Sequence, residues 1–378
     1  MSCAAAEICG GCLYRGEAEE VYRSRKRQAL AALLPRIIQA DISLGEPVFI
    51  PDGTRRRASL AFSIKKGCLT LGFNRRQSSE LVDLPCCPLL TPGLNAALPV
   101  IRRLLREICA VPYTVKTGKK IQTCKIVAGD VWLTETDAGI DVVLEYDAPL
   151  GLEHRMIIFE LANAAPEIVR ISHRRKVNSP AEPVVEKTRP YITIGSFPVY
   201  IPAGTFLQPS KQGEQALTAL VQKYLGDTRG KIADLFCGVG TFSYVLAADP
   251  ANKITAVDSS VSLLEGFRES VNRNQIPNIQ ILTRNLFKYP LDGKELAGFD
   301  VVVFDPPRAG ASAQATQMAA LPFSAKPSKI IAVSCNPHSF VTDANILIGG
   351  GYRLEEITLV DQFIYSNHSE LVALFTKV

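Results

Sequence analysis

The chain has 378 residues, of which 47% are hydrophobic and 21% charged, and its formal net charge is +5 at pH 7. This length exceeds that of one typical core, so we expect more than one domain in an ordinary soluble protein whose mild charge permits an anionic partner without requiring one. No apolar run approaches the ~20 residues that span a bilayer, and the first residues lack a signal-peptide pattern, so we exclude a membrane protein and expect a cytoplasmic one.

A cysteine cluster opens the chain. Its first three cysteines, spaced C-x5-C-x2-C, are Cys3, Cys9 and Cys12, with Gly10 and Gly11 between the last two. Cytoplasmic thiols stay reduced, so the ten cysteines are not a disulfide framework. Cys87, which precedes a proline, is the better candidate for a fourth ligand, although Cys86 stays open. The three-plus-one spacing favours a [4Fe–4S] cluster over a four-cysteine zinc site, and unliganded thiols remain the alternative.

The first half of the chain then alternates between helical and β-rich patterns. We expect helices over residues 17–34 and 92–108, a hairpin over residues 58–74, and further strands between residues 111 and 185. Trp132 lies on one of these strands and is expected in the core. Basic clusters recur in this half, at Arg55–Arg57, Lys65–Lys66, Arg75–Arg76, Lys116, Lys119, Lys120 and His173–Lys176. Such clusters suit a nucleic-acid backbone, so this half is predicted to carry a nucleic-acid-binding face, with solvated turns as the alternative.

Prolines at positions 180, 183 and 190 mark a linker, after which the pattern becomes α/β. We therefore predict two domains, residues 1–188 and residues 189–378. A buried strand over residues 232–236 is followed by Gly238 and Gly240, and the next strand ends at Asp258. A strand, a glycine turn and a helix form a cofactor cradle, in which Asp258 could accept both hydroxyls of a ribose. A third glycine is missing, so the turn resembles the S-adenosylmethionine loop of Rossmann-like methyltransferases rather than a dinucleotide site.

Three more motifs carry polar or nucleophilic groups. Gln208, in Phe206-Leu-Gln208, has an amide that both donates and accepts hydrogen bonds. Asp305 begins Asp305-Pro-Pro-Arg308 at the end of a predicted strand, where ligand-facing residues gather in open α/β sheets. The next strand delivers Cys335, whose thiolate would be a nucleophile. Two final strands follow, and Glu370 enters the last one.

These motifs together resemble the bacterial RNA uracil-C5 methyltransferases, in the branch that carries a [4Fe–4S] cluster. The matching residues span nearly the whole chain and are Cys3, Cys9, Cys12 and Cys87, Phe206-x-Gln208, residues 234–240, residues 305–310, residues 334–336 and His368-x-Glu370. The resemblance implies Cys335 as nucleophile and Glu370 as base. It also implies cofactor or substrate contacts at Gln208, Phe236, Asp258 and Asp305, although many members have Glu where this chain has Asp258.

The expected protein is thus a Rossmann-like class I S-adenosylmethionine methyltransferase domain joined to an N-terminal iron–sulfur, β-rich α+β RNA-binding domain. C5 of uracil is a weak nucleophile, so the Cys335 thiolate would add to C6, C5 would take the methyl group, and Glu370 would remove the C5 proton. We expect a monomer that acts on RNA whose target base is exposed or flipped, with 23S ribosomal RNA ahead of transfer RNA. A cytosine-C5 methyltransferase and a non-catalytic iron–sulfur RNA-binding protein are the alternatives.

Overall fold

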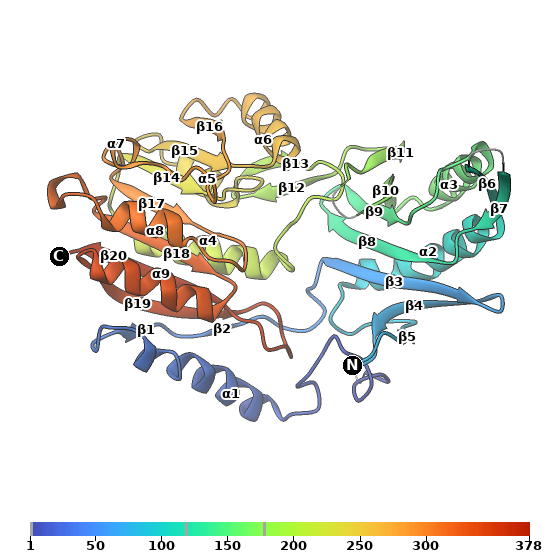
Figure 1. Cartoon of the computed structure of the whole chain (residues 1–378), viewed down its shortest axis with the longest axis horizontal. Coiled ribbons are helices and arrows are strands. Elements are labelled where there is room, and N and C mark those ends of the chain that lie inside the picture. The colour runs from blue at the N-terminus through green and yellow to red at the C-terminus, as the bar shows by residue number, and fades with distance from the viewer. Residues whose placement is uncertain (1–2, 118–119, 177–178) are drawn as a thin grey trace. The chain divides into compact units, whose positions relative to one another are not determined.

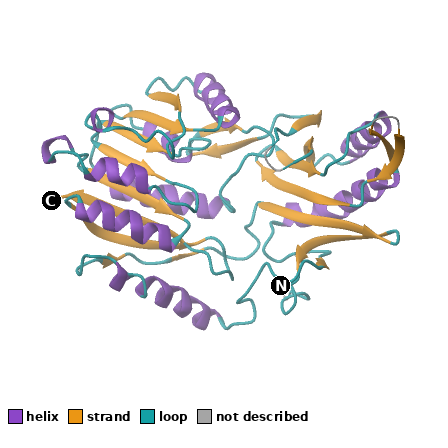
Figure 2. Ribbon diagram, in the orientation of Figure 1, coloured by secondary structure: helices purple, strands orange, loops and turns teal. Residues whose placement is uncertain are grey.

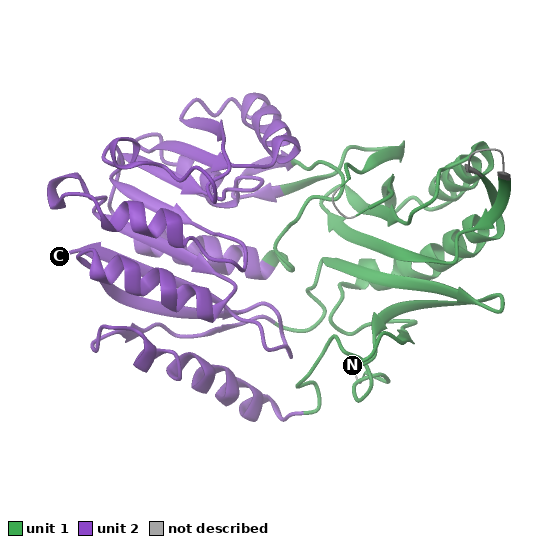
Figure 3. Cartoon of the chain, in the orientation of Figure 1, with its two compact units in different colours: residues 1–16, 51–192, 200–211 green, residues 17–50, 193–199, 212–378 purple. Residues whose placement is uncertain are grey.

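The computed structural model describes residues 3–117, 120–176 and 179–378. These residues form two compact units that interleave in the sequence (Figure 3). Unit 1 comprises residues 1–16, 51–192 and 200–211, and unit 2 comprises residues 17–50, 193–199 and 212–378. No helix among the described residues is long and apolar enough to cross a membrane.

Unit 1 is built on a seven-stranded sheet with the order β11-β10-β9-β8-β3-β4-β5. Its strands are β3 (Arg57–Lys65), β4 (Cys68–Asn74), β5 (Leu81–Asp83), β8 (Ala128–Thr136), β9 (Gly139–Glu145), β10 (Ile168–Arg174) and β11 (Glu182–Glu186). The hairpin β6 (Pro112–Thr117) and β7 (Lys120–Lys125) and the helices α2 (Pro92–Ala110) and α3 (Leu152–Ala164) complete it. All strand pairs of the sheet are antiparallel except β9 with β10.

The predicted hairpin and the predicted helix of unit 1 are present, and one helix was missed. Lys66 and Gly67 have positive φ angles of 51° and 78°, as a tight turn between β3 and β4 requires. Helix α2 starts with the Thr91 side chain accepting from the Leu94 amide at 3.3 Å, followed by a proline in its first turn. Helix α3 was not predicted from the sequence because apolar residues also occupy its exposed side. Leu152 and Phe159 on that side are 76% and 56% exposed, so the apolar residues of this segment do not follow a clear helical period.

Unit 2 is built on a larger sheet, which the helices of this unit surround (Figure 2). Its order is β1-β19-β20-β18-β17-β14-β15-β16, and β2 also pairs with β19. The strands are β1 (Ser43–Leu44), β2 (Val48–Phe49), β14 (Lys231–Leu235), β15 (Lys253–Asp258), β16 (Ile279–Thr283), β17 (Val301–Phe304), β18 (Lys329–Ser334), β19 (Tyr352–Asp361) and β20 (Glu370–Lys377). Every pair is parallel except the two pairs that β20 makes with β18 and β19.

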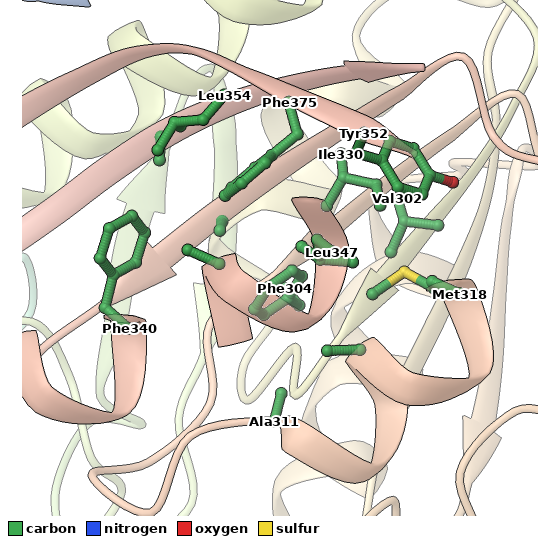
Figure 4. Packing of buried hydrophobic residues seen from close by; sticks show 14 of the residues in the cluster. Val302, Phe304, Ala311, Met318, Ile330, Phe340, Leu347, Tyr352, Leu354 and Phe375 are labelled. Atoms are coloured by element: carbon green, nitrogen blue, oxygen red, sulfur yellow. The ribbon is translucent and has the colours of Figure 1, made fainter. Parts of the chain in front are cut away.

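Helices cover this sheet and bury a continuous core. They are α1 (Glu19–Ala31), α4 (Lys211–Leu225), α5 (Thr241–Ala247), α6 (Val261–Arg273), α7 (Gly293–Leu296), α8 (Ser312–Ala319) and α9 (Pro337–Gly349), with short 3₁₀ turns at Leu34–Arg36 and Phe323–Ala325. Figure 1 shows α8 and α9 lying over β17, β18, β20 and β19. Figure 4 shows Phe304, Met318 and Phe340 among the apolar side chains of this layer, all at most 2% exposed. Burying such a side chain contributes roughly 1.5–3 kcal/mol.

The N-terminal segment 17–50 packs within unit 2. Its helix α1 packs beside β19, and β1 and β2 extend the sheet in parallel with the same strand. The expected helix over residues 17–34 is therefore present but shorter, ending at Ala31 before a 3₁₀ turn that contains Pro35. The strands β12 (Tyr191–Ile194) and β13 (Phe197–Tyr200) contribute residues to both units.

Candidate active site

The predicted catalytic residues meet at one edge of the sheet of unit 2. Parallel strands β14, β15, β17 and β18 all end at this edge, so Asp305 and Cys335 follow neighbouring strands there. Strand β20 runs the opposite way and therefore begins at the same edge. In its pairing with β18, Ser334 lies opposite Leu371, which puts Cys335 and Glu370 side by side at the strand ends. The fold thus joins two residues that lie far apart in the sequence.

Glycine is required at positions 238 and 240 of the predicted loop for two different structural reasons. Gly238 has a φ angle of +56°, and a Cβ atom built on it would meet nothing within 4 Å, so space lies open above the backbone. Gly240 has a φ angle of +89°, and a Cβ atom there would lie 2.4 Å from the ring of Phe267 on α6. Gly238 therefore leaves room for a ligand, whereas Gly240 is needed for close packing of the turn on a helix.

Phe236 stands between β14 and these glycines, outside the strand in which it was predicted. Its φ angle of +61° is unusual for an aromatic residue, and its ring lies 5.3 Å from that of Phe287. Phe287 is 49% exposed and follows β16, and sequence reasoning missed it because a lone phenylalanine outside a motif carries no signal. The pair provides an apolar surface beside the glycine turn. Backbone strain such as the positive φ angle of Phe236 is often found at functional sites.

Carboxylates beside this turn fit S-adenosylmethionine. Asp258 accepts hydrogen bonds from the amides of Gly238 at 3.1 Å and Ser260 at 2.9 Å, and each oxygen keeps a second lone pair. Asp234 is fully buried, and Ser243 donates to its Oδ2 at 2.6 Å, whereas its buried Oδ1 has no hydrogen-bond partner in the described chain. Burial raises the pKa of Asp234 to about 7. An orphaned carboxylate oxygen beneath an open turn suits a ligand with a cationic amino group and hydroxyls.

Cys335 is half-buried, and its surroundings favour the thiol. Its pKa is raised to about 11, first by burial and then by the carboxylates of Glu370 and Asp305. The guanidinium of Arg308 and a backbone hydrogen bond act in the opposite direction and favour the thiolate. Glu370, Asp305 and Arg308 all change the pKa of Cys335, so these four side chains form one cluster.

Glu370 and Asp305 are two buried acidic groups of the site, and the charge of Asp305 acts on Glu370. Glu370 is 4% exposed, and its pKa is raised first by burial and then by the charge of Asp305. Burial likewise raises the pKa of Asp305. The side chain of Gln362 hydrogen-bonds Glu370 and lowers its pKa, as does Arg308 through its charge. A buried carboxyl whose pKa lies near neutrality is suited to accept a proton during a reaction.

Arg308, Gln362 and His368 are site residues whose roles sequence reasoning missed. Nη2 of Arg308 lies 3.0 Å from Nε2 of His368. Arg308 was visible within the Asp305-Pro-Pro-Arg motif, but its proximity to Cys335 and Glu370 depends on the order of the strands. Gln362 follows the end of β19 and has no sequence signal of its own.

Gln208 and Phe206 belong to unit 1, whereas the other predicted cofactor residues belong to unit 2. Gln208 is 8% exposed, and its backbone carbonyl oxygen accepts a hydrogen bond from Nε of Arg56 at 3.1 Å. Phe206 is 55% exposed, and the guanidinium of Arg57 lies 4.8 Å from its ring centroid. An exposed ring stacked with arginine is a surface on which a nucleobase can stack.

The four predicted cluster cysteines gather in unit 1 as free thiols. Cys9, Cys12 and Cys87 are buried and Cys3 is half-buried, whereas Cys86 is exposed. The pKa of Cys12 is raised to about 12, first by burial and then by the thiols of Cys87 and Cys9. Cys3 also raises the pKa of Cys12 and that of Cys87. The thiols of Cys3, Cys9, Cys12 and Cys87 therefore influence one another, and Cys87 is buried whereas Cys86 is exposed.

The backbone around these thiols is held by specific bonds. Nη2 of Arg76 donates to the carbonyl oxygens of Ala6 at 2.7 Å and Cys12 at 2.6 Å, and its Nε donates to that of Cys9 at 3.2 Å. Asn95 fixes Cys87 by accepting from its amide at 2.8 Å and donating to its carbonyl at 3.0 Å. Such preorganisation suits a liganded loop.

The described residues contain no preformed site for one metal ion. Within residues 3–117, 120–176 and 179–378, no three His, Cys, Asp or Glu side chains lie close enough together to hold one ion. Four thiolates around one zinc ion would stand about 2.3 Å from it, whereas a cluster of several irons lies between sulfurs that are farther apart.

Several of the predicted basic clusters have structural roles. Arg56 is buried, Arg174 pairs with Glu145 at 2.6 Å, and Arg175 pairs with Asp147 at 2.6 Å. Trp132 is not a core residue: it is half-buried, with the guanidinium groups of Arg57 and Arg174 at 5.2 and 4.9 Å from its ring. Lys119 lies outside the described residues, and the side chains of Lys116 and Lys120 are likewise not described.

Known proteins and a protein family are similar to this chain. The family described as tRNA (Uracil-5-)-methyltransferase matches residues 168–378. An uncharacterized RNA methyltransferase of Brucella suis biovar 1 is 36% identical over 378 residues, which cover 100% of this chain and 84% of the relative. The 23S rRNA (uracil(1939)-C(5))-methyltransferase RlmD of Aeromonas salmonicida is 28% identical over 378 residues, covering 98% of this chain and 80% of the relative.

A solved structure shares the fold. A tRNA (uracil-54, C5)-methyltransferase of Pyrococcus abyssi, in complex with S-adenosyl-L-homocysteine, superposes with a TM-score of 0.72 at 22% identity. The match covers 97% of this chain and 86% of that one. The family match spans more than half of the chain, and a relative above 30% identity covers all of it. The chain therefore belongs to the S-adenosylmethionine-dependent RNA uracil-C5 methyltransferases.

Proposed function

We propose that this enzyme methylates C5 of a uridine in 23S ribosomal RNA through a covalent adduct between Cys335 and C6 of the uracil ring. The observation that carries the mechanism is the pairing of β18 with β20, which sets Cys335 beside Glu370. The preference for 23S ribosomal RNA draws on the relative named for that substrate and on the cysteine pattern. Transfer RNA stays the second candidate because the family description names it.

In this mechanism Cys335 acts first. Its thiolate sulfur bonds to C6, and the electrons of the C5–C6 double bond move toward the C4 carbonyl, which makes C5 a nucleophile. Arg308 lowers the pKa of the thiol and so increases the fraction of thiolate. Asp258, Asp234 and the Gly238 turn would hold S-adenosylmethionine, which would supply the methyl group that C5 receives.

Glu370 completes the proposed reaction. Its carboxylate takes the proton from C5, the electrons of that C–H bond restore the C5–C6 double bond, and the C6–S bond breaks to release Cys335. Gln362 holds the carboxylate by a side-chain hydrogen bond. Glu370 is 4% exposed, so its carboxyl group is shielded from most contact with bulk water.

The substrate is tested by methyl transfer and by mapping. Purified enzyme with labelled S-adenosylmethionine should label uridine-containing RNA and leave RNA with cytidine at the target unlabelled. In a strain that lacks the gene, one 5-methyluridine should disappear from 23S ribosomal RNA, and expression of the enzyme should restore it. Loss of the modification from transfer RNA alone would contradict the 23S assignment and leave the chemistry intact.

We also propose that Cys3, Cys9, Cys12 and Cys87 hold a [4Fe–4S] cluster that shapes the RNA-binding part of the enzyme. Cys9, Cys12 and Cys87 are buried, and the charge of the half-buried Arg55 interacts with Cys87 and Cys12. Burial lowers the pKa of Arg55, and thiolates held by iron would supply negative charge beside its partly buried guanidinium. The chemistry itself requires no redox step.

Iron content tests the cluster. Protein purified without oxygen should be brown and contain about four irons per chain, because four thiolates hold one [4Fe–4S] cluster. Cys87→Ser should lose the iron, whereas Cys86→Ser, the matched control next to it, should keep it because Cys86 is exposed. Stoichiometric zinc without iron would contradict the proposal, and iron loss in the Cys86 variant alone would move the fourth ligand.

Two further proposals concern the roles of the two halves of the chain and the oligomeric state. We propose that RNA binding resides mainly in residues 1–188 and the chemistry in residues 189–378, with residues 17–50 packing inside unit 2. We also propose that the enzyme acts as a monomer, since all groups of the mechanism come from one chain.

A further inference from the structure

Helix α1 buries a lysine and a tyrosine in unit 2. Lys26 is 3% exposed and Tyr22 is 4% exposed, although the helix is otherwise largely exposed. A buried ammonium group is costly unless each of its three hydrogens has an acceptor. A buried ion pair adds little stability compared with apolar residues of similar volume, so stability alone is a weak reason for Lys26.

The acceptors of Lys26 lie around the segment that leads into Glu370. Its Nζ is 2.8 Å from Oδ1 of Asp361, the last residue of β19. The same nitrogen donates to the carbonyl oxygen of His368 at 2.6 Å and to Oγ of Ser369 at 3.1 Å. One ammonium group therefore binds both ends of the segment Asp361–Ser369, which we name the base segment.

Tyr22 binds the middle of the base segment. Its hydroxyl group donates to Oδ2 of Asp361 and accepts from the amide of Tyr365 at 2.7 Å. The rings of Tyr22 and Tyr365 lie 5.0 Å apart. Tyr365 has a φ angle of +59°, a conformation that costs energy in a residue with a side chain and persists only when neighbours hold it.

The base segment carries groups that touch the reaction centre. Gln362 hydrogen-bonds Glu370, and His368 lies 3.0 Å from Arg308, which in turn acts on both Cys335 and Glu370. Lys26 bonds the two residues that immediately precede Glu370. A shift of the segment would therefore move the carboxylate and its hydrogen-bond partner together.

We propose that Tyr22 and Lys26 are positioning residues that hold Glu370 where its carboxylate reaches the C5 proton. This inference rests on the proposed role of Glu370 as base. Both residues are at most 4% exposed and bond the base segment, so both act through that segment. Their loss should slow proton removal, which is the last step, more than methyl transfer, which depends on Cys335.

The test separates these two steps in a single turnover. With labelled S-adenosylmethionine, methyl incorporation into RNA is followed together with the fraction of RNA that stays covalently attached in a denaturing gel. Lys26→Met should slow release of methylated RNA about tenfold or more, because hydrogen bonds of a charged group are lost, and the adduct should accumulate. Tyr22→Phe should give a smaller effect, about threefold to tenfold.

Two controls make a merely structural role visible. Arg27→Met removes the same charge from the exposed side of the same helix, where Arg27 is 51% exposed, and should behave as the wild type. The double variant Lys26→Met/Asp361→Asn removes both buried charges, which should restore thermal stability. It should nevertheless accumulate adduct, because the bonds to His368 and Ser369 remain absent.

Each result bears on the proposal. Adduct accumulation in Tyr22→Phe and in the double variant, with normal cofactor binding, supports it even if Lys26→Met alone does not fold. Wild-type release in both variants, while Glu370→Gln does accumulate adduct, overturns the positioning role and leaves the base assignment standing. Absence of adduct in Glu370→Gln itself overturns the base assignment and, with it, this inference.

Discussion

Cys335→Ala should abolish methylation, with a loss of at least about a thousandfold in single-turnover rate, because the covalent nucleophile disappears. Binding of S-adenosylmethionine should stay close to that of the wild type, since the residues that fit the cofactor lie on β14, β15 and the turn between β14 and α5. Labelled methyl transfer and calorimetric cofactor binding measure the two properties separately.

A matched cysteine variant supplies the control. Cys68→Ala changes an exposed cysteine of unit 1 and should leave methylation unchanged. RNA with 5-fluorouridine at the target should trap the wild type and the Cys68 variant as covalent complexes, because fluorine cannot leave as a cation. If Cys335→Ala still forms such a complex, another cysteine is the nucleophile.

Cys237 is the nearest alternative in the sequence, and its surroundings argue against it. It is buried beneath the glycine turn, and its pKa is raised far above the ordinary value, first by burial and then by Asp234 and Asp258. Arg308, the cation that favours the thiolate of Cys335, is not among the groups acting on Cys237. A nucleophile needs both exposure to substrate and a stabilised thiolate.

Glu370→Gln should permit methyl transfer and stop the release of product. Glutamine keeps the size and hydrogen-bonding capacity of the side chain but cannot accept the C5 proton. The methylated base would then stay bonded to Cys335, so a denaturing gel should show an accumulating complex of enzyme and RNA that contains the labelled methyl group. Normal turnover of this variant would place the base elsewhere.

The pH dependence of release provides a second measurement on Glu370. Burial and the charge of Asp305 raise its pKa from 4.5 to about 8, and only the carboxylate accepts a proton. Release should therefore become faster as the pH rises toward and through about 8, and this dependence should be absent in Glu370→Gln. An invariant release rate between pH 6 and about 9 in the wild type would contradict the assignment.

The same raised pKa affects stability with a defined sign. The folded state keeps the Glu370 proton up to about pH 8, whereas the unfolded chain releases it near 4.5. The folded state thus binds more protons in this window, so stability falls as the pH rises through it. The melting temperature of Glu370→Gln should exceed that of the wild type at pH 8, and the difference should be smaller at pH 5. Each kcal/mol by which the substitution raises the free energy of unfolding should raise the melting temperature by roughly 2–4 °C.

Local patterns in the sequence were sufficient to predict much of unit 2. The strands over residues 232–235, 253–257, 279–283 and 301–304 are short apolar runs, and their buried character needs no knowledge of the partner strands. Parallel strands share one carboxyl edge, so the placement of Asp258, Asp305 and Cys335 at strand ends could also be predicted. The cysteine spacing likewise depends on adjacent residues alone.

The remaining features depend on contacts between distant segments. Only the antiparallel insertion of β20 between β18 and β19 brings Glu370 to the edge where Cys335 lies, 35 positions earlier in the chain. Helix α3 was missed because its exposed side is apolar, and Trp132 was assigned to the core because its flanking arginines are remote in sequence.

The sequence by itself determined the α/β class of the second half, the residue types of the site and the chemistry that they support, because these follow from local apolar periodicity and motifs. Tertiary structure alone decided which of these residues meet, that Lys26 of α1 bonds the segment before Glu370, and that Cys87 rather than Cys86 is buried with the other thiols. The physical reason is that burial and charge coupling depend on distances in space, which hydrogen-bond register and packing set and sequence spacing does not.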